Sequence, residues 1–235
     1  MKSFLMIGQS NMAGRGNFGE VEDIINQRCF MLRNGRWTEM REPINPDRGV
    51  FDYYNSGIGL AASFADEYTK HFDEEIGLIP CAEGGSMISQ WQPGEILYDH
   101  AIAQAKLALR YNEIIGILWH QGESDSNSEE KIKLYRERLE NTLLSVIRDL
   151  SLPESTPIIM GELGEFVGRY RDGACSRYTE INAIMHEFAS DNKNVAVASA
   201  DGLTCKEDGI HFNSASYRVF GKRYFDEYLK LRGQE

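Results

Sequence analysis

MKSFLMIGQSNMAGRG, residues 1–16, opens with an apolar run that stops abruptly at Gly8. An apolar run of this length that ends at a glycine is typical of a fully buried strand, and the small polar residues after it are typical of a tight turn. Ser10 therefore lies at the predicted carboxyl end of a buried strand, the edge where open α/β sheets bind ligands. A serine there is a candidate nucleophile, although serine is also a favoured N-cap of a following helix.

Four more apolar runs follow, and amphipathic patterns separate them. The expected strands are 4–7, 76–82, 114–119, 157–163 and 195–199, and the expected helices are 59–72, 95–111, 132–150, 176–190 and one that begins near 214. Short strands that are apolar on both faces and alternate with helices predict a parallel sheet covered on both sides. We therefore expect one α/β domain over residues 1–235, a three-layer α/β/α, flavodoxin-like fold whose five parallel strands have the order 2-1-3-4-5.

The polar stretch between the first strand and the first helix contains a hairpin signal. Two short runs, 29–32 and 37–40, flank Arg33-Asn34-Gly35-Arg36, and Asn-Gly between such runs predicts a small β-hairpin excursion. The segment 43–49, which contains Pro43, Pro46, Asp47, Arg48 and Gly49, is predicted to be a loop. Long loops inside compact domains are usually functional, so we expect this one to help wall a substrate pocket.

Composition excludes several classes of partner. The chain has 36 acidic and 25 basic residues and a net charge of −11, which disfavours nucleic acid and anionic membranes because both would repel it. The four cysteines are widely separated and show neither a CxxC pair nor metal-ligand spacing. The apolar run before Gly8 is too short for a secretory signal and no run reaches membrane-spanning length, so we expect a cytoplasmic protein. Composition predicts no oligomeric state.

Candidate catalytic or ligand-binding residues lie just after four of the five predicted strands. Ser10 follows the first strand, Gly84 and Gly85 the second, residues 121–123 the third, and residues 208–211 the fifth. In the order 2-1-3-4-5 the first and third strands flank the topological switch point, so we expect these loops to meet in one cleft.

A serine hydroxyl needs a base within hydrogen-bond reach, and His211 is the best placed of the five histidines. A carboxylate, Asp208, precedes it by three residues, and a glycine lies between them. Asp208 could hold the imidazole tautomer and stabilise the imidazolium cation. The alternative for DGIHFN, residues 208–213, is an Asx turn that leads into the last helix.

Acyl transfer also needs hydrogen-bond donors for the developing oxyanion. The candidates are the N–H of Ser10, the N–H of Gly84 and the side-chain amide of Gln121. The alternatives are an ordinary strand-to-helix turn at Gly84 and a polar residue that solvates a strand end at Gln121.

Four blocks, in this order and at these spacings, resemble the SGNH (GDSL-like) hydrolase superfamily: GQSNMAGRG, EGGSMISQW, WHQGESD and DGIHFN. More narrowly, they resemble its carbohydrate esterase branch, which contains acetylxylan esterases and the sialic-acid O-acetylesterase domain. The likeness spans residues 3 to about 225. It implies the SGNH hydrolase fold, Ser10 as nucleophile, His211 as base, Asp208 as its partner, and an oxyanion hole from Ser10, Gly84 and Gln121. The broad superfamily has Asn where this chain has Gln121, a departure that the narrower branch shares.

Glu123 is a second candidate acid. In the narrower branch a glutamate at this position is associated with the catalytic histidine, so the resemblance implies that Glu123 and Asp208 could both reach His211; the alternative is that Glu123 organises the loop backbone. Three residues close to these candidates in sequence have other expected roles. We expect His120 to be structural or to line a pocket, Trp91 to stack on a sugar or to lie in the core, and Arg15 to close the Ser10 loop.

These patterns predict a serine esterase that removes O-acetyl groups from carbohydrate, similar to acetylxylan esterases, through a Ser-His-Asp triad and an acetyl-enzyme. The expected partner is an acetylated oligosaccharide or sugar, and no cofactor or metal is expected. A sialate O-acetylesterase or another small-acyl esterase is the first alternative. A catalytically silent carbohydrate-binding module on the same scaffold is the second. A nucleotide binder and a metallohydrolase are disfavoured because neither GxxxxGK[ST] nor HExxH occurs.

Overall fold

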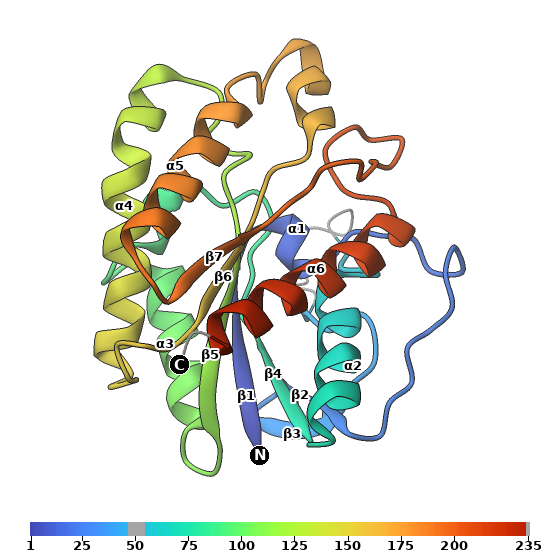
Figure 1. Ribbon diagram of the computed structural model, residues 1–235. Coiled ribbons are helices and arrows are strands. Elements are labelled where there is room, and N and C mark those ends of the chain that lie inside the picture. Colours follow the sequence, from blue (N-terminus) through green and yellow to red (C-terminus); the bar gives the residue numbers. More distant parts are fainter. Residues whose placement is uncertain (47–54, 234–235) are drawn as a thin grey trace.

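One sheet runs through the middle of the computed structural model, which describes residues 1–46 and 55–233 (Figure 1). Within these residues its strands are β1 Lys2–Gly8, β2 Cys29–Arg33, β3 Arg36–Glu39, β4 Ile76–Pro80, β5 Glu113–His120, β6 Ile158–Gly161 and β7 Val195–Ala198. The order across the sheet is β3-β2-β4-β1-β5-β6-β7. The five predicted strands, β4-β1-β5-β6-β7, pair in parallel and stand in the predicted order. The prediction of five strands was too low by the two strands of the hairpin.

The hairpin β2–β3 extends the sheet instead of standing apart from it. β2 pairs in parallel with β4, and β3 pairs antiparallel with β2. Asn34 and Gly35 turn the chain with φ of 50° and 74°, which is the left-handed geometry that an Asn-Gly hairpin turn requires. Met31 packs into the apolar cluster on one face of the sheet and Leu32 into the cluster on the other. β2 is therefore buried on both faces inside the sheet, and β3 is a mostly exposed edge strand.

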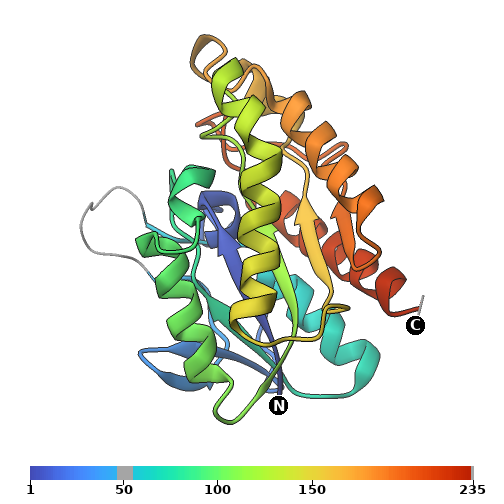
Figure 2. The ribbon, with the colours of Figure 1, turned by 90° about the vertical axis from the view of Figure 1, so that its left-hand side faces the viewer.

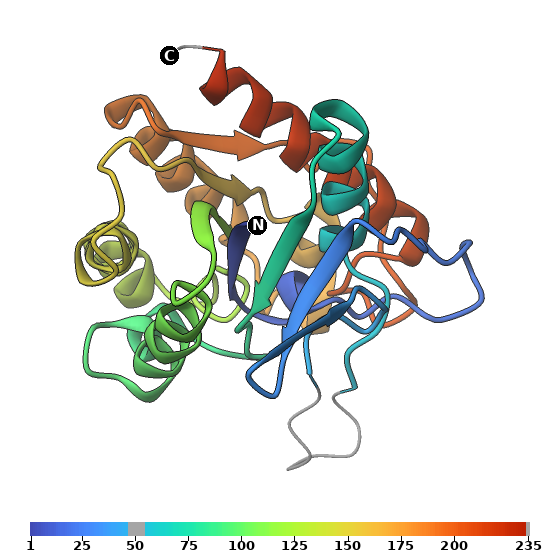
Figure 3. The same cartoon turned by 90° about the horizontal axis from the view of Figure 1, so that it is seen from below.

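Helices cover both faces (Figures 1 and 2). α3 (Ile96–Ala108), α4 (Glu129–Asp149) and α5 (Tyr178–Asp191) lie on one face, and α2 (Leu60–Phe72) and α6 (Ser214–Arg232) lie on the other. Figure 3, seen from below, shows the two helical layers on opposite sides of the twisted sheet. Successive residues of β1 serve the two layers, because Leu5 and Ile7 pack with the first group and Phe4 and Met6 with the second. The predicted three-layer α/β fold is confirmed.

The layer formed by α2 and α6 is rich in aromatic rings. Phe4 of β1 meets Phe64 of α2 at 4.7 Å between ring centroids and Tyr228 of α6 at 5.1 Å, both edge to face. All three rings are buried. Aromatic pairs in this geometry stabilise a core beyond their area burial, so they fix α6, and the loop before it, against β1.

Three short helical segments were not predicted from the sequence. They are α1 (Ser10–Ala13), η1 (Ile88–Trp91) and η2 (Glu165–Asp172), and they follow β1, β4 and β6. Each lies at the carboxyl edge of the sheet, where the candidate residues gather. The predicted loop at Asp47 to Gly49 lies outside the described residues. No helix in the described part of the chain is long and apolar enough to cross a bilayer.

Candidate active site

The chain reaches Ser10 through an unusually close approach of β1 to β5. Gly8 has a φ of 131°, and a Cβ built on it would lie 2.2 Å from the carbonyl oxygen of His120. Only glycine tolerates both constraints. Gln9 then donates its N–H to the same His120 carbonyl at 2.8 Å, and Ser10 begins α1. Gln9 occupies the N-cap position without a side-chain capping bond, so Ser10 does not serve as the cap.

Ser10, His211 and Asp208 form one hydrogen-bonded chain. His211 Nε2 lies 2.9 Å from Ser10 Oγ, and His211 Nδ1 lies 2.8 Å from Asp208 Oδ2. Ser10 is 5% exposed, and the side chains of His211 and Asp208 are 17% and 37% exposed. These atoms have the order and spacing that nucleophile, general base and orienting acid need.

Asp208 makes the contacts of both alternatives that the sequence left open. Its Oδ1 accepts the backbone N–H groups of Ile210 and His211 at 3.1 and 3.0 Å, which is an Asx turn, while Oδ2 faces the imidazole. Partial burial opposes ionisation, but the hydrogen bonds from the His211 ring and from these two N–H groups outweigh it and hold the pKa of Asp208 well below its usual range. Asp208 is therefore a fixed anion beside the base.

Gly84 lies against the nucleophile. The neighbouring Glu83 donates its N–H to the carbonyl of Gly8 at 2.9 Å, which ties the loop after β4 to the end of β1. A Cβ built on Gly84 would lie 3.8 Å from Ser10 Cβ and 2.6 Å from an Arg15 guanidinium nitrogen. In the described part of the chain, the N–H groups of Ser10 and Gly84 have no protein acceptor. Both are available to a substrate oxygen.

Gln121 has partners other than the one expected from the sequence. Its amide nitrogen donates to Asp125 Oδ2 at 2.6 Å, and it lies 3.0 Å from the Ser86 carbonyl oxygen and 3.2 Å from Gln9 Oε1. Tyr135 donates to its amide oxygen at 3.0 Å. Because an amide nitrogen carries two hydrogens, these acceptors leave no donor for an oxyanion. Gln121 is buried and ties the loop after β4 to the loop after β5.

Glu123 also faces away from the predicted partner. Its Oε1 lies 2.5 Å from Asn11 Nδ2 and 3.3 Å from His120 Nε2. Both ring nitrogens of His211 are already taken by Asp208 and Ser10. An imidazole has only two nitrogens, so the arrangement with one carboxylate on each side of His211 is not formed. Glu123 is buried, and its pKa is lowered because the nearby His120 and the bonds from His120 and Asn11 outweigh its desolvation.

Asn11 contacts the histidine loop, and sequence reasoning missed it. The side chain is 1% exposed and bonds to the carbonyl of Ile210 at 3.1 Å and to the N–H of Phe212 at 3.3 Å. The one available signal was a polar residue in a turn expected to be buried, directly after the candidate nucleophile.

The three neighbouring residues have structural positions. His120 is fully buried and lies 3.2 Å from the hydroxyl of Tyr224 through Nδ1. Trp91 is also fully buried and donates to Ser86 Oγ at 2.9 Å, so it cannot stack on a sugar. Arg15 donates to the Gly14 carbonyl at 2.8 Å and lies 3.4 Å from Ser56 Oγ.

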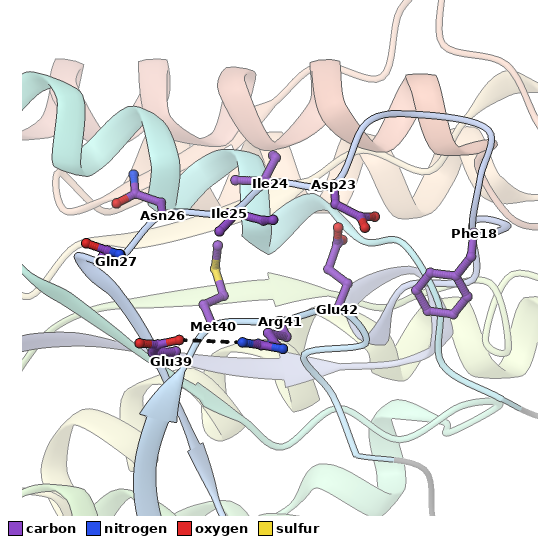
Figure 4. Close-up of a pocket in the computed structure, with 10 residues that line it drawn as sticks. All are labelled: Phe18, Asp23, Ile24, Ile25, Asn26, Gln27, Glu39, Met40, Arg41 and Glu42. Atoms are coloured by element: carbon purple, nitrogen blue, oxygen red, sulfur yellow. Dashed lines mark ion pairs between the residues drawn. The ribbon is translucent and has the colours of Figure 1, made fainter.

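A cavity of about 260 Å³ lies elsewhere, along the segment that follows the Ser10 loop (Figure 4). It is lined by Phe18, residues 23–27 and residues 39–42. Glu42, on its wall, is engaged by Arg218 and by the N–H of Gly59. None of Ser10, Asp208 or His211 lines this cavity, so it is separate from the candidate active site.

The fold is shared with several solved proteins. The solved structure of a protein from Arabidopsis thaliana, AT4G34215, superposes with a TM-score of 0.85 at 26% identity and covers 97% of this chain and 98% of that one. NanS superposes with a TM-score of 0.80 at 16% identity, covering 99% and 98%. XAC1771, a carbohydrate acetylesterase from Xanthomonas citri, gives 0.73 at 17%, covering 99% of this chain and 56% of that one. These superpositions show that the chain has the same fold as these proteins.

Sequence comparison reaches the same group. A curated protein of Arabidopsis thaliana, named probable carbohydrate esterase At4g34215, is 29% identical over 248 residues that cover 96% of this chain and 89% of that protein. The family model described as "Carbohydrate esterase, sialic acid-specific acetylesterase" matches residues 1–230. The resemblance predicted from the four sequence blocks is therefore confirmed. The chain belongs to this family of carbohydrate esterases.

Proposed function

We propose that this chain is a serine esterase that hydrolyses O-acetyl esters on carbohydrate hydroxyls through Ser10, His211 and Asp208. The observation that carries the proposal is the continuous hydrogen-bonded chain from Asp208 through His211 to Ser10 Oγ, at 2.8 and 2.9 Å. Membership of a carbohydrate esterase family supports the substrate class.

In the first half of the reaction, Ser10 Oγ attacks the acetyl carbonyl carbon while His211 Nε2 takes the hydroxyl proton. The carbonyl oxygen becomes an oxyanion, and the N–H groups of Ser10 and Gly84 are the donors available to stabilise it. The anionic carboxylate of Asp208 stabilises the imidazolium. His211 then returns the proton to the sugar oxygen as the C–O bond breaks, which releases the alcohol and leaves an acetyl-enzyme.

In the second half, water replaces the sugar. His211 takes a proton from the water, whose oxygen attacks the acetyl carbon, and the collapse of the oxyanion breaks the bond to Ser10 Oγ. The proton returns to Ser10 and acetate leaves. No step in this scheme uses Gln121 as a donor to the oxyanion or Glu123 as the acid partner of His211, which revises the site expected from the sequence.

We propose two classes of substrate. Acetylated oligosaccharides of the xylan type follow from the sequence resemblance. The description of the matching family names sialic acid, which favours O-acetyl sialic acid as the second candidate. Both present an acetyl ester on a sugar hydroxyl, so they call for the same chemistry at Ser10. A cytoplasmic location stays a prediction.

The test is acetate release from acetylated xylo-oligosaccharides, O-acetyl sialic acid and acetylated monosaccharides, with p-nitrophenyl acetate as a general ester. Ser10→Ala should lower kcat on every active substrate by about 10⁴-fold or more. Ser190→Ala is the matched control, since Ser190 lies on the exposed surface of α5 and bonds only to the Glu187 carbonyl of its own helix within the described residues.

Each outcome of this test decides something. Unchanged turnover in Ser10→Ala would refute the serine mechanism. Release from one sugar class, lost in Ser10→Ala and kept in Ser190→Ala, would support both mechanism and substrate. Cleavage of p-nitrophenyl acetate alone would keep Ser10 as nucleophile but refute a carbohydrate substrate among those offered, and binding of sugars without any turnover would support the non-enzymatic alternative.

A further inference from the structure

We propose that Asn11 is a positioning residue that holds the loop of the catalytic base at its working distance from the nucleophile; this rests on the proposed function. Asn11 follows Ser10 directly in α1. Its side chain bonds to the carbonyl of Ile210 and to the N–H of Phe212, the residues on either side of His211. One buried amide, next in sequence to Ser10, thus holds the backbone on both sides of a base that is 201 residues away from Ser10 in sequence.

The orientation of this amide is fixed by four partners. Asn11 Nδ2 donates to the Ile210 carbonyl at 3.1 Å and to Glu123 Oε1 at 2.5 Å, while Oδ1 accepts the N–H of Phe212 at 3.3 Å and the hydroxyl of Tyr217 at 2.6 Å. A backbone N–H can only donate, and a carbonyl or carboxylate oxygen can only accept. Rotating the amide by half a turn would therefore set donor against donor and acceptor against acceptor. The side chain has one arrangement that satisfies it.

A buried chain of contacts stands behind the amide. Glu123 Oε1 lies 3.3 Å from His120 Nε2, and His120 Nδ1 lies 3.2 Å from the hydroxyl of Tyr224 on α6. That hydroxyl donates to the Trp119 carbonyl of β5 at 2.9 Å. His120, Glu123 and Tyr224 are each no more than 2% exposed. The loop after β5 holds Asn11 through Glu123, and helix α6 holds it through Tyr217.

The geometry gives this arrangement a catalytic consequence. His211 Nε2 must stay within hydrogen-bond reach of Ser10 Oγ, now 2.9 Å. Within the loop, Lys206 donates its N–H to the His211 carbonyl at 2.8 Å, and its ammonium group donates to the carbonyl of Arg15, just after α1, at 2.7 Å. Without the Asn11 amide, the loop keeps these two bonds and loses the bonds that hold Ile210 and Phe212 directly against α1. A displacement of the base by about 1 Å costs about 10²-fold in rate.

The chain supplies a matched control for the test. Asn182 on α5 bonds in the same way to the backbone of one residue, accepting the N–H of Leu163 at 2.8 Å and donating to its carbonyl at 3.0 Å. Asn11→Ala and Asn182→Ala therefore remove the same side chain and the same kind of backbone contact. They differ in that Asn11 lies beside the base loop, is buried and also bonds to the side chains of Glu123 and Tyr217, whereas Asn182 is partly buried.

The measurements are kcat and KM for p-nitrophenyl acetate, the rate at which a fluorophosphonate labels Ser10, and the melting temperature. Asn11→Ala should lower kcat and the labelling rate by about 10²-fold while KM changes by less than about threefold. Asn182→Ala should lower the melting temperature while kcat and the labelling rate stay within about threefold of the parent. Equal kcat losses in the two variants, or a change in melting temperature alone, would overturn the proposal.

Tyr217→Phe keeps the inference testable if Asn11→Ala does not fold. It removes the one donor from α6 to Asn11 Oδ1 and should lower kcat several-fold at unchanged KM, and an unchanged kcat would count against the proposal. In the double variant the two losses should not add, because Tyr217 acts through Asn11. Ser10→Ala, measured beside them, separates the two ideas: full turnover there refutes the proposed function, whereas loss there with normal turnover in Asn11→Ala refutes this inference alone.

Discussion

Replacing Asp208 by Asn tests which acid serves the base. Asp208 Oδ2 lies 2.8 Å from His211 Nδ1, and Oδ1 accepts two backbone N–H groups. In Asp208→Asn the remaining side-chain oxygen is held by those N–H groups, which keeps the Asx turn. The amide nitrogen must then face the imidazole. Because that nitrogen donates, Nδ1 has to be the unprotonated position, and the ring proton moves to Nε2.

That tautomer disables the base. A protonated Nε2 faces Ser10 Oγ at 2.9 Å and cannot accept the hydroxyl proton. The imidazolium also loses the anion that stabilises it. For an aspartate in this role the loss is about 10⁴-fold in kcat, which is about 5 kcal/mol of transition-state stabilisation. KM should change little, since Asp208 does not touch the substrate in the proposed scheme.

The assay is p-nitrophenyl acetate hydrolysis at pH 7 to 8, with two comparisons. Asp201→Asn makes the same change of charge at an exposed position at the start of the same loop and should leave kcat within about twofold of the parent. Glu123→Gln should lower kcat by far less than Asp208→Asn does, because Glu123 contacts Asn11 and His120. If Asp208→Asn loses less than about tenfold while Glu123→Gln loses more, the assignment of the acid is wrong.

Three further outcomes are expected. Gly8→Ala should lower the free energy of unfolding, measured in urea, by about 3 kcal/mol, because its Cβ would lie 2.2 Å from a backbone oxygen. Gly19 is also at positive φ but has open space around it, so Gly19→Ala should lower the free energy of unfolding by only about 1 kcal/mol. Equal losses in the two variants would contradict the steric argument. Ser128→Ala should lower the free energy of unfolding by about 1 kcal/mol, since Ser128 caps α4 by accepting the N–H of Lys131 at 3.3 Å. An unchanged urea midpoint would show that this cap does not stabilise the fold. Because the pKa of Asp208 is lowered in the folded protein, its ionised form stabilises the fold above its unfolded pKa of about 3.9, and this contribution is lost as the pH falls. The difference in melting temperature between the parent and Asp208→Asn should therefore be constant above about pH 5 and shrink below about pH 4. A difference that grows in acid would contradict the lowered pKa.

The sheet was predictable where burial alone determines the pattern. β4, β1, β5, β6 and β7 are covered on both faces, so each is a continuous apolar run, and helical crossovers limit their order. The hairpin turn at Asn34-Gly35 was predictable because it is local. The pairing of β2 with β4 was not, because backbone hydrogen bonds join the two strands and residue type does not indicate which strand a hairpin will pair with.

In the candidate site too, contacts that are local in sequence were predictable and contacts between distant segments were not. Asp208 and His211 are three residues apart, and a local Asx turn brings them together. The partners of Gln121 and Glu123 depend on where their side chains point once distant loops have come together. Residue type indicates which groups a side chain can bond to, but it does not indicate the direction in which the side chain points. Asn11 was missed for this reason, since its backbone partners lie 199 and 201 residues away.

Burial distinguishes the His211–Asp208 pair, which we propose for the chemistry, from the His120–Glu123 pair behind Asn11. His120 and Glu123 are no more than 2% exposed, and their side chains bond to groups inside the protein, so neither is open to solvent or to a substrate. The His211 and Asp208 side chains are 17% and 37% exposed, and Nε2 faces a hydroxyl that itself gives up its proton. A base that accepts and returns a proton twice in each turnover needs that access. The buried pair instead contacts Asn11 through Glu123, so in the proposed scheme the His211–Asp208 pair serves the chemistry and the His120–Glu123 pair serves the position of the base.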